Sequence, residues 1–255
     1  MTASASATAL VIGASGGLGQ ALWQQLKADG SYADVLAISR LASEQCDSGW
    51  FQADATCPEQ LAVVAQQIGE RFGKLDLLIN CTGMLHESGL RPEKSLRQLD
   101  QDSFLKVMSV NAFAPLVALQ TFAPLLRKAA SDSGIAPGND TGAAVAVTLS
   151  AMVGSITDNR LGGWYSYRMS KAALNMGLRN AAIELARYAD GPVVVAVHPG
   201  TTLTDLSEPF VGNRKKNQQV RTAASSAVHI LKVVRGLSRE DTGKFLNWDG
   251  SELEC

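Results

Sequence analysis

The sequence has little that marks a secreted, membrane-spanning or metal-binding protein. It contains only four cysteines and three histidines, which show neither paired spacing nor clustering with one another. Reduced thiols in a cytoplasmic protein are therefore expected, and no metal site is predicted. The first eight residues lack the basic start and apolar run of a signal peptide. No stretch approaches the roughly 20 apolar residues of a membrane span.

Charge of either sign is also modest, with 23 Lys and Arg against 24 Asp and Glu and a formal net charge of -1. This balance gives no electrostatic reason to expect a nucleic acid or an anionic membrane as a partner. The 255 residues, of which 46% are hydrophobic, suffice for one sizeable α/β domain but are too few for two comfortable ones. We therefore expect residues 1–255 to form a single domain.

Short apolar runs alternate with longer amphipathic segments along the chain. The runs Leu-Asp-Leu-Leu-Ile-Asn and Pro-Val-Val-Val-Ala-Val do not alternate with polar residues, which is typical of parallel strands covered on both faces. Repeated strand–helix–strand units predict a doubly wound parallel sheet with helices on both faces. Strands are predicted at residues 9–12, 35–39, 75–80, 143–149, 193–197 and 244–247, and helices at 17–28, 58–72, 102–128, 165–188 and 221–234.

Two polar stretches interrupt this alternation. Residues 131–142 are rich in Ser, Gly, Asp and Pro and are interpreted as a surface excursion before a strand. Residues 208–219 are polar and basic and follow a Pro-Gly turn, so they are interpreted as a mobile flap within a substrate loop near 202–219. We find no repeat and no linker that divides the chain.

Tyr167 and Lys171 are the most informative pair of residues. They stand four apart in Ser-Tyr-Arg-Met-Ser-Lys, so on a helix their side chains share one face. A phenol exchanges its proton poorly near pH 7, because its reference pKa is about 10. An ammonium beside it favours the phenolate and is expected to lower that pKa toward the working range. The alternative is an ordinary surface helix that carries a Tyr and a Lys without a chemical role.

A glycine-rich segment lies between the first predicted strand and the first predicted helix. Glycines in this place allow a tight turn and let the backbone approach a pyrophosphate, which then sits on the N–H groups of the helix start. The spacing Gly-x-x-x-Gly-x-Gly favours nucleotide binding over a turn that only packs a helix on a strand. The candidate contacts are Gly13, Ser15, Gly17, Leu18 and Gly19.

The end of the second predicted strand carries Ser39 and Arg40 and no acidic residue. An Asp or Glu here selects the free ribose 2′-hydroxyl, whereas an Arg accommodates a 2′-phosphate. Arg40 would pair with that phosphate and Ser39 would donate a hydrogen bond to it, which favours NADP(H) over NAD(H). Asp54, after a short third strand, is a candidate for the adenine amino group, with helix capping as the alternative.

Six motifs in register resemble the short-chain dehydrogenase/reductase family over essentially the whole chain. They are Gly13–Gly19, Asp54, Asn80-Cys-Thr-Gly83, Asn111, the Ser150 region with Tyr167 and Lys171, and Pro199-Gly200. The segments Leu-Ser-Ala-Met-Val-Gly-Ser-Ile, Gly-Gly-Trp-Tyr-Ser-Tyr-Arg-Met-Ser-Lys and Asn-Trp-Asp-Gly are similar to the C-factor branch, near the sniffer-type carbonyl reductases. The resemblance implies a Rossmann fold and a nicotinamide cofactor.

The resemblance also implies roles for individual residues. Tyr167 would be the general acid in carbonyl reduction and the base in alcohol oxidation, and Lys171 would tune it and bind the nicotinamide ribose. Asn111 would hold a water that links Lys171 to solvent. Asn80 and Gly83 would border the adenine-side ribose and the nicotinamide passage. After Pro199 and Gly200, the backbone around Thr202 would meet the carboxamide, with Thr204 near the pyrophosphate.

This sequence departs from the family's pattern at the position of the catalytic serine. Alignment on Gly154 places Ala151 in the usual position, and a shift of one residue along a strand points a side chain to the opposite face. Ser150 turns inward at the strand end, or Ser155 supplies the hydroxyl from the following loop, or the site lacks this donor. Ser150 is the favoured candidate.

Together these observations predict an NADPH-dependent reductase of a small carbonyl, acting as a homodimer. Loops 86–99, 156–164 and 203–216 are expected to set substrate identity, and an apolar pocket is expected around Met152, Leu161, Trp164 and Phe210. The apolar residues Phe113, Leu116 and Leu178 on the two long helices are candidates for dimer interface or core. The rival hypothesis is a regulatory protein that binds NADP(H) with little turnover.

Overall fold

A computed structural model describes residues 7–42, 48–131, 143–211 and 220–255. Its centre is a seven-stranded parallel sheet in the order β3-β2-β1-β4-β5-β6-β9. A separate two-stranded sheet joins β7 to β8 near the carboxyl edge. The strands are β1 Thr8–Ile12, β2 Asp34–Ser39, β3 Trp50–Gln52, β4 Leu77–Asn80, β5 Val145–Leu149, β6 Val193–His198, β7 Thr202–Leu203, β8 Arg221–Thr222 and β9 Phe245–Asn247.

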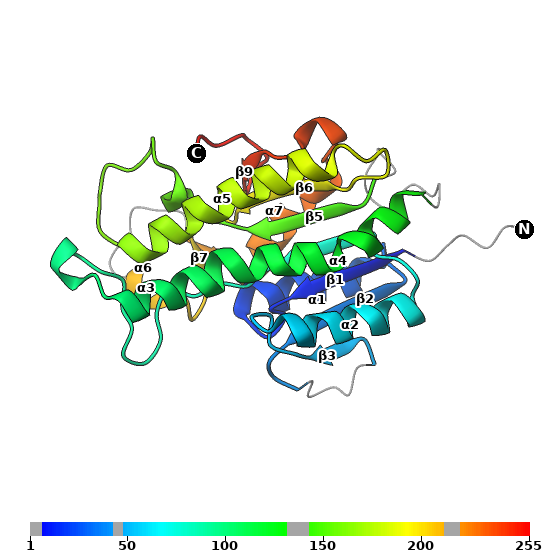
Figure 1. The fold of residues 1–255 in the computed structure, drawn as a ribbon, viewed down its shortest axis with the longest axis horizontal. Helices are drawn as coiled ribbons and strands as arrows, with labels where there is room; N and C mark the ends of the chain where they lie inside the picture. The colour runs from blue at the N-terminus through cyan, green and yellow to red at the C-terminus, as the bar shows by residue number, and fades with distance from the viewer. Residues whose placement is uncertain (1–6, 43–47, 132–142, 212–219) are drawn as a thin grey trace, which may run out of the picture.

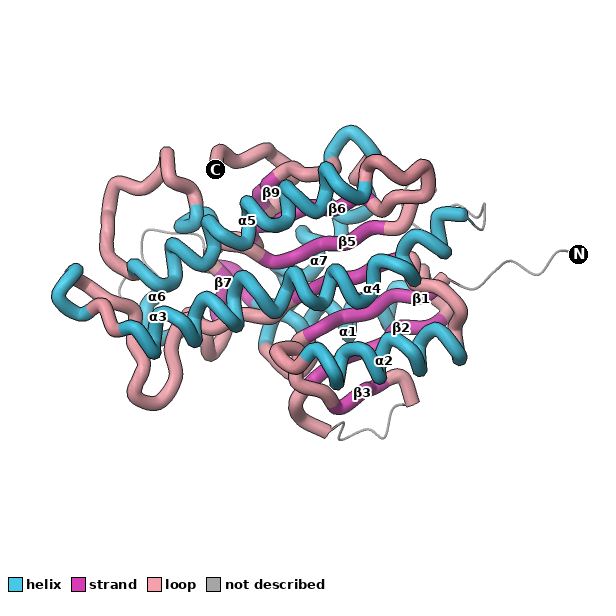
Figure 2. The backbone as a smooth tube through the Cα atoms, viewed as in Figure 1, coloured by secondary structure: helices cyan, strands magenta, loops and turns pink. Residues whose placement is uncertain are grey.

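Helices cover both faces of the sheet (Figure 1; Figure 2). In the view of Figure 1, α2, α4 and α5 lie in front of the strands, and α1 and α7 lie behind them. The helices are α1 Gly17–Asp29, α2 Pro58–Arg71, α3 Gln101–Met108, α4 Ala114–Ser131, α5 Tyr165–Leu185, α6 Glu208–Val211 and α7 Ala223–Arg235.

The apolar runs of the strands form two cores because successive side chains point to opposite faces. On β5 and the residue before it, Ala144 and Ala146 belong to the core under α2, α4 and α5, whereas Val145 and Val147 belong to the core under α1 and α7. All five residues of β5 are buried. The absence of polar alternation thus reflects a sheet that is covered on both sides, as the sequence predicts.

A π-helical turn joins α3 to α4 within one long helix. It spans Ser109–Phe113 and contains Asn111, at the place where the sequence predicts uninterrupted helix. Such turns insert one extra residue and are frequent at functional sites. The helix over 101–129 is long and apolar enough to cross a membrane, yet 44% of its most apolar window is buried inside the protein. Phe122 and Leu126 on it are fully buried, so we interpret it as a core helix.

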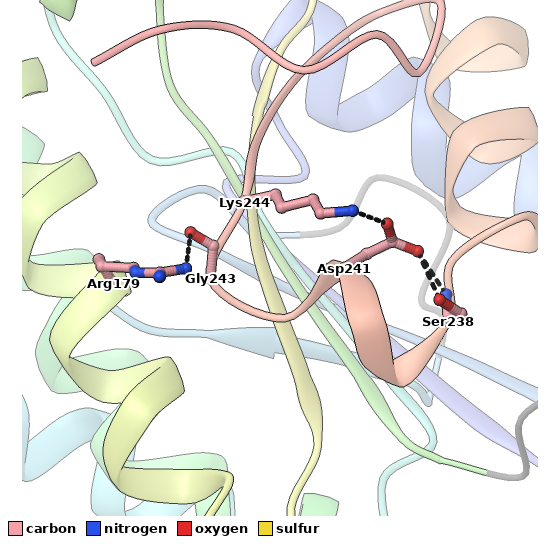
Figure 3. Close-up of polar contacts among 5 residues, drawn as sticks. All are labelled: Arg179, Ser238, Asp241, Gly243 and Lys244. Atoms are coloured by element: carbon pink, nitrogen blue, oxygen red, sulfur yellow. Dashed lines mark hydrogen bonds and ion pairs between the residues drawn. The ribbon is translucent and has the colours of Figure 1, made fainter.

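The last strand, β9, is held beside β6 by a small polar network (Figure 3). Ser238 and Asp241 form a capping box, and Asp241 accepts a hydrogen bond of 2.7 Å from Lys244 Nζ. Arg179 on α5 donates to the carbonyl oxygen of Gly243 at 3.3 Å. The C-terminal part of the chain is therefore tied directly to α5.

The predicted fold class is confirmed, with shifts of a few residues at several element ends. Strand β4 begins at Leu77, two residues late, and α5 ends at Leu185, three residues early. Leu178 faces the core with 2% exposure, so it is no candidate for an interface, and Leu116 is half-buried against the same core. Residues 132–142 and 212–219, which include most of the predicted excursion and flap, lie outside the described residues.

Candidate active site

A groove runs along the carboxyl ends of the central strands, the left-hand edge of the sheet in Figure 1. Its volume is about 400 Å³. Ligands of open parallel sheets bind at this edge, because the crossovers diverge there. Six of the predicted contacts line the groove: Gly13, Ser15, Ser39, Arg40, Asp54 and Gly83.

The glycine turn brings strand β1 and helix α1 together beside this groove. A Cβ on Gly19 would lie 2.2 Å from the carbonyl oxygen of Gly13, so only glycine allows this approach. Gly13 itself has a φ of 80°. Gly17 lies across from Thr204, whose Cγ2 is 3.2 Å from the position of a Cβ on that glycine. Leu18 packs partly buried against the core under α1, so its side chain anchors the turn.

Arg40 and Asp54 lie together at the end of the groove near β2 and β3. Arg40 is exposed, and the buried Ser39 accepts a hydrogen bond of 3.0 Å from the N–H of Leu41. Asp54 Oδ1 accepts from both the N–H and the hydroxyl of Thr56, at 2.8 and 2.7 Å. The pKa of Asp54 is lowered, chiefly by the Thr56 N–H, with a smaller contribution from the charge of Arg40. Asp54 thus shapes the turn before α2 and also lines the groove.

Two buried polar atoms beside the groove have no hydrogen-bond partner among the described residues. They are Nδ2 of Asn80, a side chain only 1% exposed, and Oγ1 of Thr82. A buried polar group without a partner costs about 1–3 kcal/mol, so each is suited to a polar ligand that enters the groove. With the basic Arg40 at one end, these donors fit a phosphorylated dinucleotide.

Asn111 ties the π-helical turn to the loop after β4 and to α5. Its Oδ1 accepts from the N–H of Met84 at 2.7 Å, and its Nδ2 donates to Met84 O at 2.8 Å and to Ser170 Oγ at 3.0 Å. A Cβ on Gly83 would lie 3.6 Å from both Asn111 Oδ1 and Lys171 Nζ. The predicted pair Asn111 and Lys171 therefore converges on Gly83, which lines the groove.

Lys171 is almost completely buried, with 4% exposure, and Tyr167 is partly buried. Lys171 Nζ donates to Leu149 O at 3.1 Å and lies 5.9 Å from the centre of the Tyr167 ring. Burial lowers the pKa of Lys171 to about 8 and raises the pKa of Tyr167 to about 12. The expected lowering of the Tyr167 pKa is therefore wrong for the protein alone, because desolvation outweighs an ammonium at that separation.

The two candidate serines have different surroundings. Ser150 lies on the α5 side of the sheet, where its Oγ donates to Asn175 Oδ1 at 2.6 Å. Ser155 Oγ accepts from the N–H of Asp158 at 3.1 Å and contacts Thr157 Oγ1, so it is used within its own loop. Both hydroxyls therefore have partners of their own, and neither hydrogen-bonds Tyr167 among the described residues, so the choice of Ser150 stays a prediction.

Aromatic side chains from two loops and from helix α6 form a chain of ring contacts that begins at Tyr167. The ring of Trp164 lies 6.1 Å from Tyr167 and 5.3 Å from Phe210, and Phe210 lies 5.4 Å from His86. Trp164 has a φ of 53°, the only positive value among non-glycine residues of the described chain. Leu161 is 80% exposed and Met152 is 41% exposed, so they line an open face and no closed pocket.

Pro199 and Gly200 follow β6, and Gly200 lies against Arg221 and Trp248. Thr202 is buried in β7, where its hydroxyl contacts Ser226 Oγ at 2.7 Å. Thr204 follows β7 and accepts the N–H of Glu208 at 2.8 Å through its carbonyl oxygen. These predicted contacts surround the start of the segment 202–211, and the rest of the predicted flap lies outside the described residues.

Sequence reasoning missed Glu93, which is 6% exposed. Its carboxylate accepts hydrogen bonds from the N–H of Ser166, at 3.2 Å, and from the Ser166 hydroxyl, and its carbonyl oxygen accepts from the Trp164 N–H. Glu93 therefore caps α5 from a loop more than 70 positions away, where no local spacing signals it. Asn175 was also missed, although its place four residues after Lys171 put it on the same helix face.

Comparisons with known proteins agree with this geometry. The family model described as short chain dehydrogenase matches residues 7–215. The chain belongs to the short-chain dehydrogenase family. It is 30% identical over 251 residues to a 1-hydroxy-2-glutathionyl-2-methyl-3-butene dehydrogenase of Rhodococcus sp. (strain AD45), covering 97% of this chain and 99% of that protein. It is 34% identical over 182 residues to C-signal of Myxococcus xanthus, covering 71% and 93%.

A solved carbonyl reductase structure is similar to this chain over nearly its whole length. The NADPH-bound carbonyl reductase from chicken fatty liver has a TM-score of 0.80 and 29% identity, with 98% of each chain covered. These similarities confirm the predicted family and its C-factor and carbonyl reductase branch. The protein is thus an NAD(P)-dependent oxidoreductase that acts on CH–OH and C=O groups.

Proposed function

We propose that this short-chain dehydrogenase uses NADPH to reduce a small carbonyl compound, with Tyr167 as the general acid. The observation that carries the proposal is that Lys171, one helical turn after Tyr167, brings its Nζ to Gly83, which lines the groove that ends at Arg40. The raised pKa of Tyr167, about 12, keeps its proton on the phenol at neutral pH. A protonated phenol is the form that a carbonyl reduction consumes.

The preference for NADP(H) over NAD(H) rests on the end of β2. Arg40 supplies a cation there and Ser39 a hydroxyl, and both line the groove. A guanidinium pairs with a phosphate in a two-point geometry that a neutral ribose hydroxyl cannot match. The similar carbonyl reductase from chicken fatty liver was solved with NADPH bound, which agrees with this preference.

When bound along the groove, a nicotinamide cofactor would supply the hydride for the carbonyl carbon. Tyr167 protonates the carbonyl oxygen, and Ser150 steadies that oxygen with a hydrogen bond. Lys171 holds its ammonium near Gly83, where the ribose hydroxyls would lie, and stabilises the phenolate left after proton transfer. Asn111 hydrogen-bonds the Met84 backbone and Ser170, so it fixes the position of the groove lining at Met84 relative to α5. In the reverse direction, the phenolate of Tyr167 takes the proton of the alcohol.

The proposed substrate is a modest apolar aldehyde or ketone. The aromatic rings of Trp164, Phe210 and His86 beside Tyr167 support this, because they present flat surfaces and little charge. Met152 and Leu161, two of the side chains predicted around the substrate, are also apolar and exposed. The Rhodococcus relative acts on a glutathionyl alcohol by its name, so glutathione adducts of aldehydes belong in the same substrate panel.

The decisive test is oxidation of NADPH against a panel of aldehydes, ketones and glutathione adducts, with Tyr167→Phe beside the wild type. Loss of a positioned general acid lowers kcat by about 10²–10⁴-fold, while the Kd for NADPH stays within a few-fold. Equal turnover by the variant would contradict the proposal. Tight NADPH binding without turnover on any substrate would favour the rival, a regulatory protein that binds the cofactor. Repeating the assay with NADH tests the cofactor preference.

We also propose that the enzyme is a homodimer that pairs through α5. Met169, Met176 and Ile183 recur every seven residues along that helix and are 49%, 64% and 50% exposed. Phe113, at 60% exposure, is the last residue of the π-helical turn and directly precedes α4. These exposed apolar side chains on α5 can pack against the same side chains of a second copy related by a two-fold axis. Light scattering coupled to gel filtration should give twice the monomer mass, and Met176→Glu should halve it.

The cytoplasmic location stays a prediction.

A further inference from the structure

The side chain of Asn175 holds the hydroxyl of the candidate serine. It lies on α5 eight residues after Tyr167 and four after Lys171, so the three side chains follow one another along a single helix face. Asn175 is 6% exposed, and its Oδ1 accepts the hydroxyl of Ser150 at 2.6 Å. Its Nδ2 is shielded from solvent and has no hydrogen-bond partner among the described residues.

The single hydroxyl hydrogen of Ser150 cannot be donated both to Asn175 and to a substrate oxygen. A hydroxyl has one hydrogen to donate and two lone pairs that accept. With the hydrogen directed at Asn175 Oδ1, Ser150 has only lone pairs left for other partners. Stabilising a developing negative charge on a substrate oxygen requires the hydrogen instead. In this arrangement Ser150 is therefore held in a form that cannot assist the reaction.

A half-turn of the Asn175 amide resolves the conflict without moving any backbone. The oxygen and nitrogen of an amide have nearly the same shape, so the turn exchanges them in place. Nδ2 then donates to Ser150 Oγ, and the Ser150 hydrogen becomes free to point at the substrate. The turn also gives Nδ2 the partner that it now lacks and leaves only an acceptor without one.

We propose that Asn175 is a positioning residue that sets the direction of the Ser150 hydroxyl. With its oxygen toward Ser150 it holds the hydrogen back, and with its nitrogen toward Ser150 it releases that hydrogen to the substrate oxygen. The inference rests on the proposed function, since it gives Ser150 a substrate oxygen to bind. Lys171 Nζ already holds the adjacent Leu149 O at 3.1 Å, so the strand end stays attached to α5 when Asn175 is changed.

Asn175→Asp and Asn175→Leu test the proposal in opposite directions. An ionised carboxylate only accepts, so it fixes the Ser150 hydrogen and should lower kcat/KM for carbonyl reduction by about 10²–10³-fold, as Ser150→Ala should. A leucine side chain neither accepts nor donates, so the hydroxyl is free but unguided, and a loss of about tenfold is expected from the missing orientation. The double variant Ser150→Ala with Asn175→Asp should lose no more than Ser150→Ala alone. Asn180→Asp, on the exposed side of α5, is the matched control and should change little.

The pH profile separates this role from simple packing. When the carboxyl group introduced by Asn175→Asp is protonated, it donates to Ser150 and frees the serine hydrogen. The deficit of that variant relative to wild type should therefore shrink as pH falls, whereas the deficit of Asn175→Leu should stay constant. Thermal melting and the Kd for NADPH confirm that each variant folds and binds cofactor.

Several outcomes would overturn the proposal. A fully active Asn175→Asp, a Leu variant as impaired as the Asp variant, or multiplied losses in the double variant would each do so. An inactive Tyr167→Phe with an active Ser150→Ala would remove Asn175 from the mechanism yet leave the proposed function in place. An active Tyr167→Phe would remove the proposed function itself.

Discussion

The two halves of the candidate site differ in how far their polar groups are exposed to water. The half near β1, β2 and β3 consists of backbone turns and accessible polar groups, such as the exposed Arg40 and the partly buried Asp54. The half near α5 buries its chemistry, with Lys171 at 4% and Ser150 at 4% exposure. The second half holds a lysine whose pKa falls to about 8 and a tyrosine whose pKa rises to about 12. Water therefore screens charge more strongly in the first half than in the second.

From this difference we expect binding and reactivity to depend on separate parts of the candidate site. An exposed cation beside a phosphate contributes affinity that falls with salt, because mobile ions screen it. A buried donor changes the rate, because its strength is realised where charge develops in a dry site. Substitutions near Arg40 should therefore act on Kd, and substitutions near Tyr167 should act on kcat.

The largest expected effect lies in the buried half. Ser150→Ala should lower kcat by about 10²–10³-fold and leave the Kd for NADPH nearly unchanged, since one hydrogen bond to the developing charge is lost. Ser155→Ala is the matched control, because the Ser155 hydroxyl serves its own loop. Single-turnover and steady-state kinetics with cofactor titrations measure both quantities. A loss confined to Ser155→Ala would transfer the role to Ser155, and two unimpaired variants would mean that the site works without this donor.

The second effect concerns the stability cost of burying Lys171. Its pKa is about 8 in the folded protein against an ordinary value of 10.5. Below pH 8 both states hold the proton, and the folded state bears the full cost of a buried charge. Between these two pKa values the unfolded state binds more protons, so the free energy of unfolding rises with pH, by on the order of 3 kcal/mol in total.

Lys171→Met removes this titration. The free energy of unfolding of the wild type, minus that of the variant, should therefore increase as pH rises through this window. Urea unfolding at a series of pH values measures it, and Lys232→Met on the exposed side of α7 should show no such trend. Contributions from Tyr167 and Cys81 titrating in the unfolded chain are common to both proteins and cancel. A difference that is flat with pH would mean that Lys171 is not buried as a charge.

The third effect belongs to the exposed half. Arg40→Asp should weaken NADPH binding by about 10–100-fold, because a charge-assisted hydrogen bond worth about 1.5–3 kcal/mol is replaced by repulsion. NADH binding should change by less than about threefold, and kcat at saturating NADPH should hold, because screened charge at this end contributes to affinity alone. Fluorescence titrations at two salt concentrations measure the affinities, with Arg97→Asp as a control at another exposed arginine. Equal losses for NADPH and NADH would remove the assignment of a 2′-phosphate to Arg40.

The contrast between the exposed half and the buried half also explains which parts of the fold and of the site can be predicted from the sequence. The sheet, its helices and the glycine turn follow from local patterns, because apolar runs and short turns encode them within a few residues. The groove contacts Gly13, Ser39 and Arg40 were predictable for that reason. Their roles in binding stay predictions.

The buried half was harder to foresee because its properties come from packing. Tyr167 and Lys171 have the expected spacing, yet the Tyr167 pKa moves upward because desolvation depends on everything that surrounds the phenol. The Ser150–Asn175 contact joins residues 25 positions apart, and no spacing rule specifies it. The π-helical turn at Asn111 adds one residue to a helix whose periodicity gives no sign of it.

The smallest expected effect tests whether Glu93 connects its loop to the buried start of α5. It comes from a loop, yet its carboxylate is buried against the first turn of α5, where its partner Ser166 directly precedes Tyr167. Glu93→Ala should lower the free energy of unfolding by about 1–2 kcal/mol, as loss of a helix cap does. The Trp164 N–H donates to the Glu93 backbone carbonyl oxygen, which the Ala variant keeps. A looser first turn of α5 should still shift Trp164, which directly precedes that helix, so the Ala variant should raise KM more than it lowers kcat.

Two matched variants separate this cap from a general effect of removing a carboxylate. Glu93→Gln keeps one acceptor for the start of α5 and should lose less stability than Glu93→Ala, whereas Glu184→Ala on the exposed side of α5 should be neutral. Thermal melts and steady-state kinetics on the same preparations measure both effects. If Glu93→Ala is as stable as the wild type and has the same KM, the Glu93 carboxylate does not stabilise the start of α5. The loop that carries Glu93 would then have no part in positioning Tyr167.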